Sequence, residues 1–262
     1  LPEIYYLSEV MNYPGVIHED PELMRKIAAA QRHGKPIDGH APAVTGNDLQ
    51  KYVGAGISTD HECFRLAGAL EKISLGMKIL IREGSAARNF DALIPLMATH
   101  PDKRMFCSDD KHPDELDDVH IDVLVRKAIA LGYDIMDVLK AASLNAIRHY
   151  NLNVGLLQLG DDADFIVVDD LHAPVAKQTY IRGELVAENG VSNIHYKETE
   201  TPNIFKAEFI HADDILLPDV GKNIKVIECK DGHLITKSFV TEPRVENGAI
   251  VSDVERDILK IV

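Results

Sequence analysis

The sequence has 262 residues, 45% hydrophobic and 27% charged, an ordinary globular composition for one large or two smaller domains. Its formal net charge of −14 argues against nucleic acid or an anionic membrane surface as a partner. The cysteines, Cys63, Cys107 and Cys229, show no C-x-x-C spacing, which fits a reducing cytoplasm without a disulfide framework. No run of about 18 apolar residues occurs, so no membrane span is expected.

Residues 3–150 read as five strand-to-helix units in succession. Strands are predicted at 3–10, 36–40, 57–61, 77–84 and 104–108. Helices are predicted at 23–31, 47–53, 64–74, 90–99, 117–131 and 135–150. Asp20 and Pro21 are typical of a helix start, whereas Pro14-Gly15 indicates a turn.

Every predicted strand ends in ionisable side chains. They are Glu9, His40, His61, Arg82 with Glu83, and Asp109 with Asp110. In a parallel α/β fold these ends meet at one edge of the sheet, where ligands bind. A doubly wound sheet is disfavoured because no Gly-rich phosphate loop follows any strand. We therefore expect a partial (β/α)8 TIM-type barrel that comprises strands four to eight.

The pattern changes after residue 150, where turns and short alternating strands predict a mostly β region. Residues 178–190 indicate a hairpin with Gly183-Glu184 near its turn, and 223–229 and 234–240 indicate further strands. We expect three domains, at 1–150, 151–200 and 201–262.

Imidazole and carboxylate side chains are common ligands of zinc, iron and manganese, and four of the strand ends offer them. A metal site is predicted from Glu9, His40, His61 and Asp109. A lone histidine at a strand end is more often structural, but here two occur on consecutive units beside acidic residues. Two ions about 3.5–4 Å apart can make hydroxide a nucleophile at neutral pH, and a nearby carboxylate can take its proton.

Simpler interpretations remain for the other polar residues. Arg82 and Glu83 are adjacent in sequence and form an ion pair in one interpretation. Cys63 and Cys107 are more often small core residues than nucleophiles.

Five motifs resemble the bacterial adenine deaminases of the amidohydrolase superfamily and occur in that family's order. They are Ser8-Glu9-Val10-Met11-Asn12-Tyr13-Pro14-Gly15-Val16, Gly39-His40-Ala41-Pro42, Ser58-Thr59-Asp60-His61-Glu62, Arg82-Glu83-Gly84-Ser85-Ala86-Ala87-Arg88-Asn89 and Cys107-Ser108-Asp109-Asp110. The segment 159–169 is similar to the superfamily's return into its β-sandwich. The resemblance thus assigns 151–200 to the sandwich and 201–262 to the start of a further domain.

The resemblance implies a cytoplasmic purine-salvage enzyme that converts adenine and water to hypoxanthine and ammonia. It implies a binuclear centre of manganese or iron, with zinc as a further option. An open barrel would also expose an unpaired strand near residues 3–10, so we expect association into a homo-oligomer. Glu9 matches the bridging carboxylate of strand four. His40 and His61 match ligands of strands five and six. Asp109 matches the strand-eight aspartate that binds metal and carries the proton.

Residues near the purine also follow from the resemblance. Glu62, Glu83, Ser85 and Asp110 are expected to bind the substrate, and Glu83 is a second candidate catalytic acid.

One family feature is missing from this sequence, the H-x-H pair of strand one. We therefore expect an internal piece of an adenine deaminase that has an incomplete metal site and is inactive alone. Alternatives are another amidohydrolase acting on a cyclic amide or amine, or a non-catalytic scaffold. Dihydroorotase-like enzymes bridge their metals with a carboxylated lysine, which Glu9 disfavours.

Overall fold

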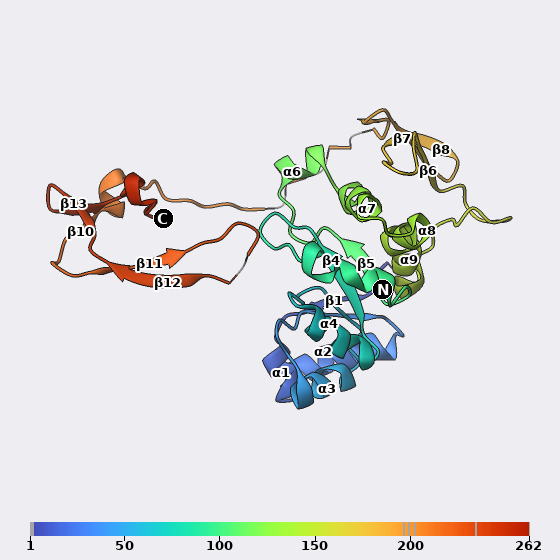
Figure 1. Cartoon of the computed structure of the whole chain (residues 1–262), viewed down its shortest axis with the longest axis horizontal. Helices are drawn as coiled ribbons and strands as arrows, with labels where there is room; N and C mark the ends of the chain where they lie inside the picture. The colour runs from blue at the N-terminus through green and yellow to red at the C-terminus, as the bar shows by residue number, and fades with distance from the viewer. Residues whose placement is uncertain (1–2, 196, 199, 202, 234, 262) are drawn as a thin grey trace. The chain divides into compact units, whose positions relative to one another are not determined.

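The computed structural model describes residues 3–195, 197–198, 200–201, 203–233 and 235–261. The chain forms two compact units, Leu1–His195 and Tyr196–Val262. Figure 1 shows the first unit as strands and helices in alternation, followed by a smaller region of strands. The second unit carries strands joined by turns and short 3-10 helices.

Unit 1 opens with five parallel strands that follow one another in chain order. They are β1 (Leu7–Val10), β2 (Ile37–Gly39), β3 (Thr59–Asp60), β4 (Lys78–Arg82) and β5 (Arg104–Cys107). β1 pairs with β2, and β3 pairs with β4, which pairs with β5. The Ser58 amide donates to the Ile37 carbonyl at 2.9 Å and joins the two groups. A strand thus lies at each of the five predicted places, although β1 begins only where pairing with β2 starts.

Helices connect these strands. They are α1 (Tyr13–Ile17), α2 (Pro21–Arg32), α3 (Gly46–Gly54), α4 (Leu66–Ser74) and α5 (Phe90–Leu93), the last continuing into a 3-10 helix, Ile94–Ala98. The Asp20 carboxylate accepts the amides of Glu22 and Leu23, as expected for a helix cap. The turn predicted at Pro14-Gly15 is wrong, because both residues lie in α1. Proline is accommodated in a first helical turn, where its missing N–H leaves no bond unmade.

The rest of unit 1 is helical and then antiparallel. The helices are α6 (Pro113–Asp118), α7 (Ile121–Ala130), α8 (Ile135–Leu139), a π-helical turn (Lys140–Leu144) and α9 (Asn145–Tyr150). The strands β6 (Phe165–Val168), β7 (Ala176–Ile181), β8 (Glu184–Glu188) and β9 (Val191–Ser192) form one sheet in that order. In the described part of the chain, each helix is too short or too polar to cross a bilayer.

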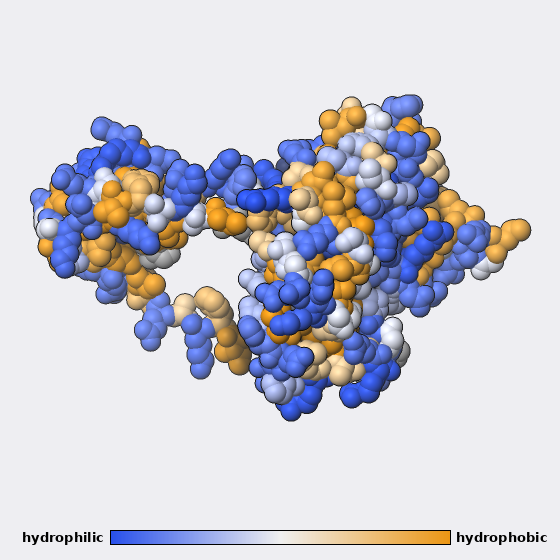
Figure 2. All heavy atoms as spheres, turned by 60° about the horizontal axis from the view of Figure 1, so that its bottom comes forward, coloured by the Kyte–Doolittle hydropathy of each residue, from blue (hydrophilic) through white to orange (hydrophobic). Residues whose placement is uncertain are grey.

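Among its described residues, unit 2 contains two small antiparallel sheets and two short 3-10 helices, Ala212–Ile215 and Val254–Arg256. One sheet joins β10 (Leu217–Pro218), β14 (Ala249–Val251) and β13 (Arg244–Glu246), and the other joins β11 (Ile224–Glu228) and β12 (Lys237–Thr241). Here Ile250 is the buried apolar residue among those described. Figure 2 shows apolar residues on the surface. In unit 2, the exposed large apolar residues include Phe239 and Val240.

The apolar core lies in unit 1 and has two parts. One part packs β1, β2 and α3 together through Val10, Ile37 and Leu49. The other packs β4 and β5 against α5 and α7, and its fully buried members include Ile81 and Leu93. Both parts reach the strand ends, so the residues that follow these strands are held on a packed support.

Gly39, the last residue of β2, is needed because β3 approaches its backbone closely. A Cβ at this position would lie 2.3 Å from the Thr59 carbonyl oxygen and 2.8 Å from Ile57 Cγ2. The oxygen belongs to the neighbouring strand's backbone and cannot swing away. A side chain here would therefore push β2 and β3 apart just below His40.

We expect Gly39→Ala to lower the free energy of unfolding by about 1–3 kcal/mol, as overpacking does. Urea unfolding measures this. The matched control is Gly68→Ala in α4, where a Cβ meets nothing within 4 Å. That change should raise stability by about 0.5–1 kcal/mol, the usual gain for alanine over glycine in a helix. Equal stability of the two variants would contradict the close approach at Gly39.

Hydrogen bonds to the buried Asp38 carboxylate connect the end of α9 to the strands. The Tyr150 hydroxyl donates to Asp38 Oδ2 at 2.8 Å, and the Thr59 hydroxyl donates to Oδ1 at 2.7 Å. His149 lies beside them, with Nε2 3.4 Å from Ser58 Oγ. Burial, and secondarily the charge of Lys78, lowers the pKa of His149 from 6.5 to about 4.

This lowered pKa makes stability depend on pH. Below pH 6.5 the unfolded chain binds a proton at His149 that the folded chain does not accept until about pH 4. The contribution of the neutral His149 imidazole to folding stability is therefore fully present above pH 6.5 and is lost as the pH falls toward 4. Between pH 7 and pH 4.5 the free energy of unfolding should fall by roughly 2 kcal/mol less in His149→Gln than in the parent chain. Thermal or urea unfolding at both pH values tests this, with exposed His33→Gln as the control; identical pH profiles would contradict it.

Candidate metal centre

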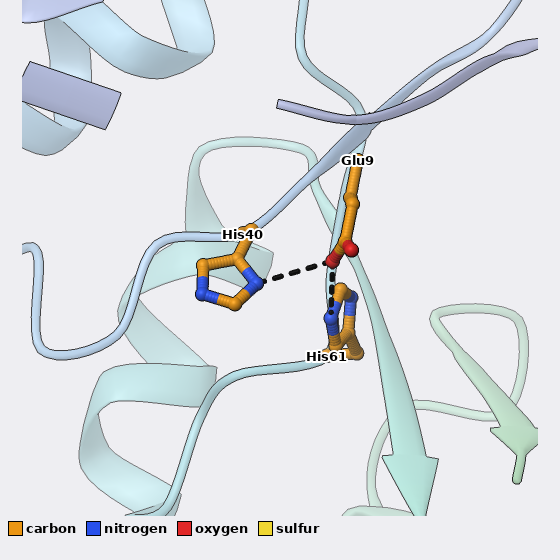
Figure 3. A group of neighbouring side chains, drawn as sticks. All are labelled: Glu9, His40 and His61. Atoms are coloured by element: carbon orange, nitrogen blue, oxygen red, sulfur yellow. Dashed lines mark hydrogen bonds and ion pairs between the residues drawn. The ribbon is translucent and has the colours of Figure 1, made fainter. Parts of the chain in front are cut away.

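Glu9, His40 and His61 meet at the ends of the first three strands (Figure 3). Glu9 lies in β1, His40 follows β2 directly, and His61 follows β3 directly. Glu9 Oε2 lies 3.1 Å from His40 Nδ1 and 2.9 Å from His61 Nε2, so both rings point to one carboxylate oxygen. The ring centroids are 5.4 Å apart.

Asp109 and Glu62 complete the cluster, and both approach the same His61 nitrogen that faces Glu9. His61 Nε2 is 3.7 Å from Asp109 Oδ1 and 3.5 Å from Glu62 Oε1. Asp109 follows β5 and has φ of 56°, a left-handed conformation that is uncommon outside glycine. This conformation turns the chain sharply after the strand and accompanies a carboxylate that faces the cluster. The structure thus brings all four sequence-predicted ligands together. Glu62, predicted as a substrate contact, lies in the same cluster.

Arg82, at the end of β4, is the cation of this cluster. Its Nη1 lies 2.6 Å from Glu62 Oε1 and also donates to Asp109 Oδ2. The side chains of Arg82 and Glu62 are 6% and 7% exposed, so these charges meet away from water. Arg82 therefore pairs with carboxylates of the neighbouring strands, and the structure shows Glu83 against a different cation.

The remaining candidate residues lie against other partners. Glu83 Oε2 is 2.7 Å from Lys127 Nζ of α7. Ser85 Oγ donates to Glu115 Oε2 at 2.9 Å and accepts the amide of His112. Asp110 is exposed, and its carbonyl accepts the Ser85 amide at 3.0 Å. Their assignment to substrate binding stays a prediction.

The donor set fits a divalent transition metal. Among the described residues, two groups of three side chains could each hold an ion, and within each group the possible ligand atoms lie within 4.8 Å of one another. One group is Glu9, His40 and His61, and the other is His61, Glu62 and Asp109. Imidazole nitrogen and carboxylate oxygen suit zinc, iron and manganese. The formal charges are three carboxylates against one guanidinium, an excess of negative charge that a divalent cation would neutralise.

A buried ion pair beneath the cluster fixes its two histidine loops. Lys72 of α4 and Asp60 of β3 are 1% and 0% exposed, with Nζ 2.9 Å from Oδ2. Asp60 also accepts the Ala41 amide at 2.8 Å and the Glu62 amide at 3.1 Å, while Lys72 donates to the Ala41 carbonyl at 2.6 Å. The segments after His40 and His61 are thereby joined through one carboxylate.

Two further buried side chains fix the neighbouring strand ends. The Tyr52 hydroxyl accepts the His40 amide and donates to the Val10 carbonyl, both at 2.9 Å. Burial raises the pKa of Tyr52, which keeps this donor protonated. Asn89 accepts the Arg82 amide at 2.8 Å and donates to the carbonyls of His61 and Cys63 at 2.9 and 3.0 Å. Together these two residues link β1 to β2 and β3 to β4 at the site.

Sequence reasoning missed Tyr52, Asp60, Lys72 and Asn89. The position of Asp60 directly before His61 was an available signal, because the residue before a strand-end ligand lies next to its backbone. Tyr52 and Lys72 carry no such signal, since each sits in an ordinary amphipathic helix.

The two cysteines near the site are not activated nucleophiles. Burial raises the pKa of Cys107 to about 12 and also raises the pKa of Cys63. Both thiols are therefore protonated at neutral pH, and the Cys63 thiol donates to Asp60 Oδ2 at 3.1 Å. This matches the interpretation of both as packing residues.

Comparison with known proteins identifies relatives over nearly the whole chain. The amidohydrolase family model matches residues 1–186. An adenine deaminase of Methanosarcina mazei is 50% identical over 99% of this chain and 49% of its own length. One of Salinibacter ruber is 50% identical over 99% of this chain and 48% of its own length. The chain thus spans about half the length of these curated relatives.

Solved structures share the fold at lower identity. The β-aspartyl dipeptidase of Fervidobacterium islandicum superposes with a TM-score of 0.52 at 20% identity, over 70% of this chain and 55% of its own. This likeness concerns the fold.

We expect Lys72→Met to lower the free energy of unfolding by roughly 3–5 kcal/mol, because it leaves the Asp60 charge buried without its partner. Chemical unfolding measures the loss. The matched control is Lys26→Met, which removes a surface ion pair to Glu22 whose side chains are 63% and 69% exposed. The control should cost at most about 1 kcal/mol. Similar losses in both variants would contradict the structural role of the buried pair.

Proposed function

Because the chain belongs to the amidohydrolase family, we propose that it contributes the metal-binding strand ends of an adenine deaminase, which hydrolyses adenine to hypoxanthine and ammonia. The single observation that carries the proposal is the convergence of Glu9, His40, His61 and Asp109 on one cluster. Relatives named adenine deaminase that align with nearly the whole chain support the choice of substrate.

In this proposal the parallel strands β1 to β5 are strands four to eight of a (β/α)8 barrel. Their parallel pairing in chain order and the helices between them support this assignment. Residues 1–150 would then form the barrel part, 151–200 a β-sandwich segment and 201–262 the start of a further domain.

Glu9, His40, His61 and Asp109 would hold the metal, for which we propose manganese or iron. A bound divalent ion would activate water as a nucleophile at neutral pH. Glu9 is suited to a shared position because one of its oxygens already faces both imidazoles.

Asp109 is the proposed proton carrier. Its Oδ2 is held by Arg82, while Oδ1 faces His61. A carboxylate with one oxygen fixed and the other directed into the site can take a proton from the attacking water and return it to the departing amine. Deamination needs this transfer because ammonia, not an amide anion, must leave the purine ring.

Glu62 is the best supported of the proposed substrate contacts. Its buried carboxylate faces His40 and His61, the place where the reacting carbon of a purine would lie. Glu83 and Ser85 are bound to Lys127 and Glu115 and would have to exchange these partners to reach adenine. Asp110 is exposed and its carbonyl accepts the Ser85 amide, so it is proposed as a substrate contact together with Ser85.

A chimera tests the activity. In it this chain replaces the aligned segment of the Methanosarcina mazei relative, and conversion of adenine to hypoxanthine is followed by absorbance. We expect turnover, and Asp109→Asn should lower kcat by about 10²–10⁴-fold, as loss of general acid–base catalysis does. Exposed Asp114→Asn is the control, and metal content is measured in each protein. A folded, metal-loaded chimera without adenine turnover would sink the proposal.

A further inference from the structure

Two carboxylates compete for the same side of the metal centre. Asp109 Oδ1 lies 3.7 Å from His61 Nε2. Glu62 Oε1 lies 3.5 Å from the same nitrogen and 3.6 Å from His40 Nδ1. Distance to the imidazoles therefore does not show which carboxylate is a metal ligand and which is a substrate contact. By distance alone Glu62 would be the better ligand, because it faces both rings.

Arg82 contacts a different kind of oxygen on each of these two carboxylates. On Glu62 its Nη1 lies 2.6 Å from Oε1, the same oxygen that faces the histidines. On Asp109 it donates to Oδ2, whereas the other oxygen, Oδ1, faces His61. One guanidinium nitrogen thus occupies the inward oxygen of Glu62 and the outward oxygen of Asp109.

We infer that Arg82 is a positioning residue that selects the metal's ligands, keeping Glu62 out of the coordination set while Asp109 stays in it. An oxygen engaged in a buried charge-assisted hydrogen bond has less electron density and less freedom to donate to a cation. Glu62 is thereby reserved for the substrate. This inference rests on the proposed function, since it presumes that the cluster holds a divalent metal.

The guanidinium is placed by its surroundings and not by solvent. The side chain is 6% exposed, and the Asn89 amide oxygen accepts the Arg82 backbone N–H at 2.8 Å. Within the described residues, Arg82 Nε is buried without a hydrogen-bond partner. Leaving a buried donor without a partner is unfavourable, which indicates that the contacts to the two carboxylates determine where this side chain lies. Lysine, with one point charge, would reproduce the charge but only part of the geometry.

A double-mutant cycle on metal binding tests the selection. Mn²⁺ affinity and the visible spectrum of bound Co²⁺, which reports donor set and coordination number, are measured for the parent chain, Glu62→Gln, Arg82→Met and the double variant. In the parent background Glu62→Gln should leave the Co²⁺ spectrum unchanged and shift Mn²⁺ affinity little. In the Arg82→Met background the same change should weaken Mn²⁺ binding by about tenfold or more and alter the spectrum, as loss of a ligand does.

The outcomes separate the inference from the proposed function. An Arg82→Met chain in which Glu62→Gln changes neither affinity nor spectrum overturns the inference and leaves the metal centre intact. A spectral change on Glu62→Gln in the parent chain also overturns it, because Glu62 would then already be a ligand. A parent chain that binds neither Mn²⁺ nor Co²⁺ overturns the metal centre itself.

Two further variants exclude a loss of folding or of charge as the cause. Arg82→Lys should restore the parent response to Glu62→Gln at least in part, since its ammonium can still hold a carboxylate. Arg65→Gln removes one positive charge from an exposed residue three positions after Glu62 in the sequence and should not change the response. Circular dichroism at the assay temperature confirms that each variant is folded. A response in Arg65→Gln equal to that in Arg82→Met would overturn the inference in favour of a general charge effect.

Discussion

The site depends on the buried ion pair between Asp60 and Lys72. Taking two charges out of water is costly, and the cost is offset only when their remaining hydrogen-bonding positions are filled. Here they are filled from the two histidine loops, by the Ala41 amide and carbonyl and by the Glu62 amide. The same contacts that make the ion pair tolerable therefore fix the backbone beside both imidazoles.

The carboxylates above this pair are held together against their own repulsion. Glu9, Glu62 and Asp109 all approach His61, and Arg82 is the cation that bridges two of them. Such crowding persists only where the surrounding structure dictates it, and the left-handed backbone of Asp109 is a second sign of that constraint. A divalent cation would relieve the repulsion, so metal binding and folding of this unit are expected to reinforce one another.

The sequence was sufficient for the strand ends but not for the partners of their side chains. Short β-branched, aromatic or apolar stretches that end in ionisable residues located β1 to β5. Because parallel strands end at one edge, Glu9, His40 and His61 could be grouped from the sequence alone. Glu83 was chosen over its neighbour as a site residue, yet Arg82 contacts the cluster. Adjacent strand residues point to opposite sides, and sequence does not show which side a polar pair presents.

Lys72 marks the other limit of prediction, since a lysine in an amphipathic helix is ordinarily a solvated residue. Its burial follows from Asp60, which needs a counter-charge, and that need arises only when α4 packs against β3. The proposed ligands and their anchors all lie between Glu9 and Asp109, within successive strand-to-helix units of unit 1. The geometry of the candidate metal centre is thus set by contacts between neighbouring units of the sheet. Substitutions of buried polar residues there should change the arrangement of ligands, whereas apolar substitutions in the same helices should change stability alone.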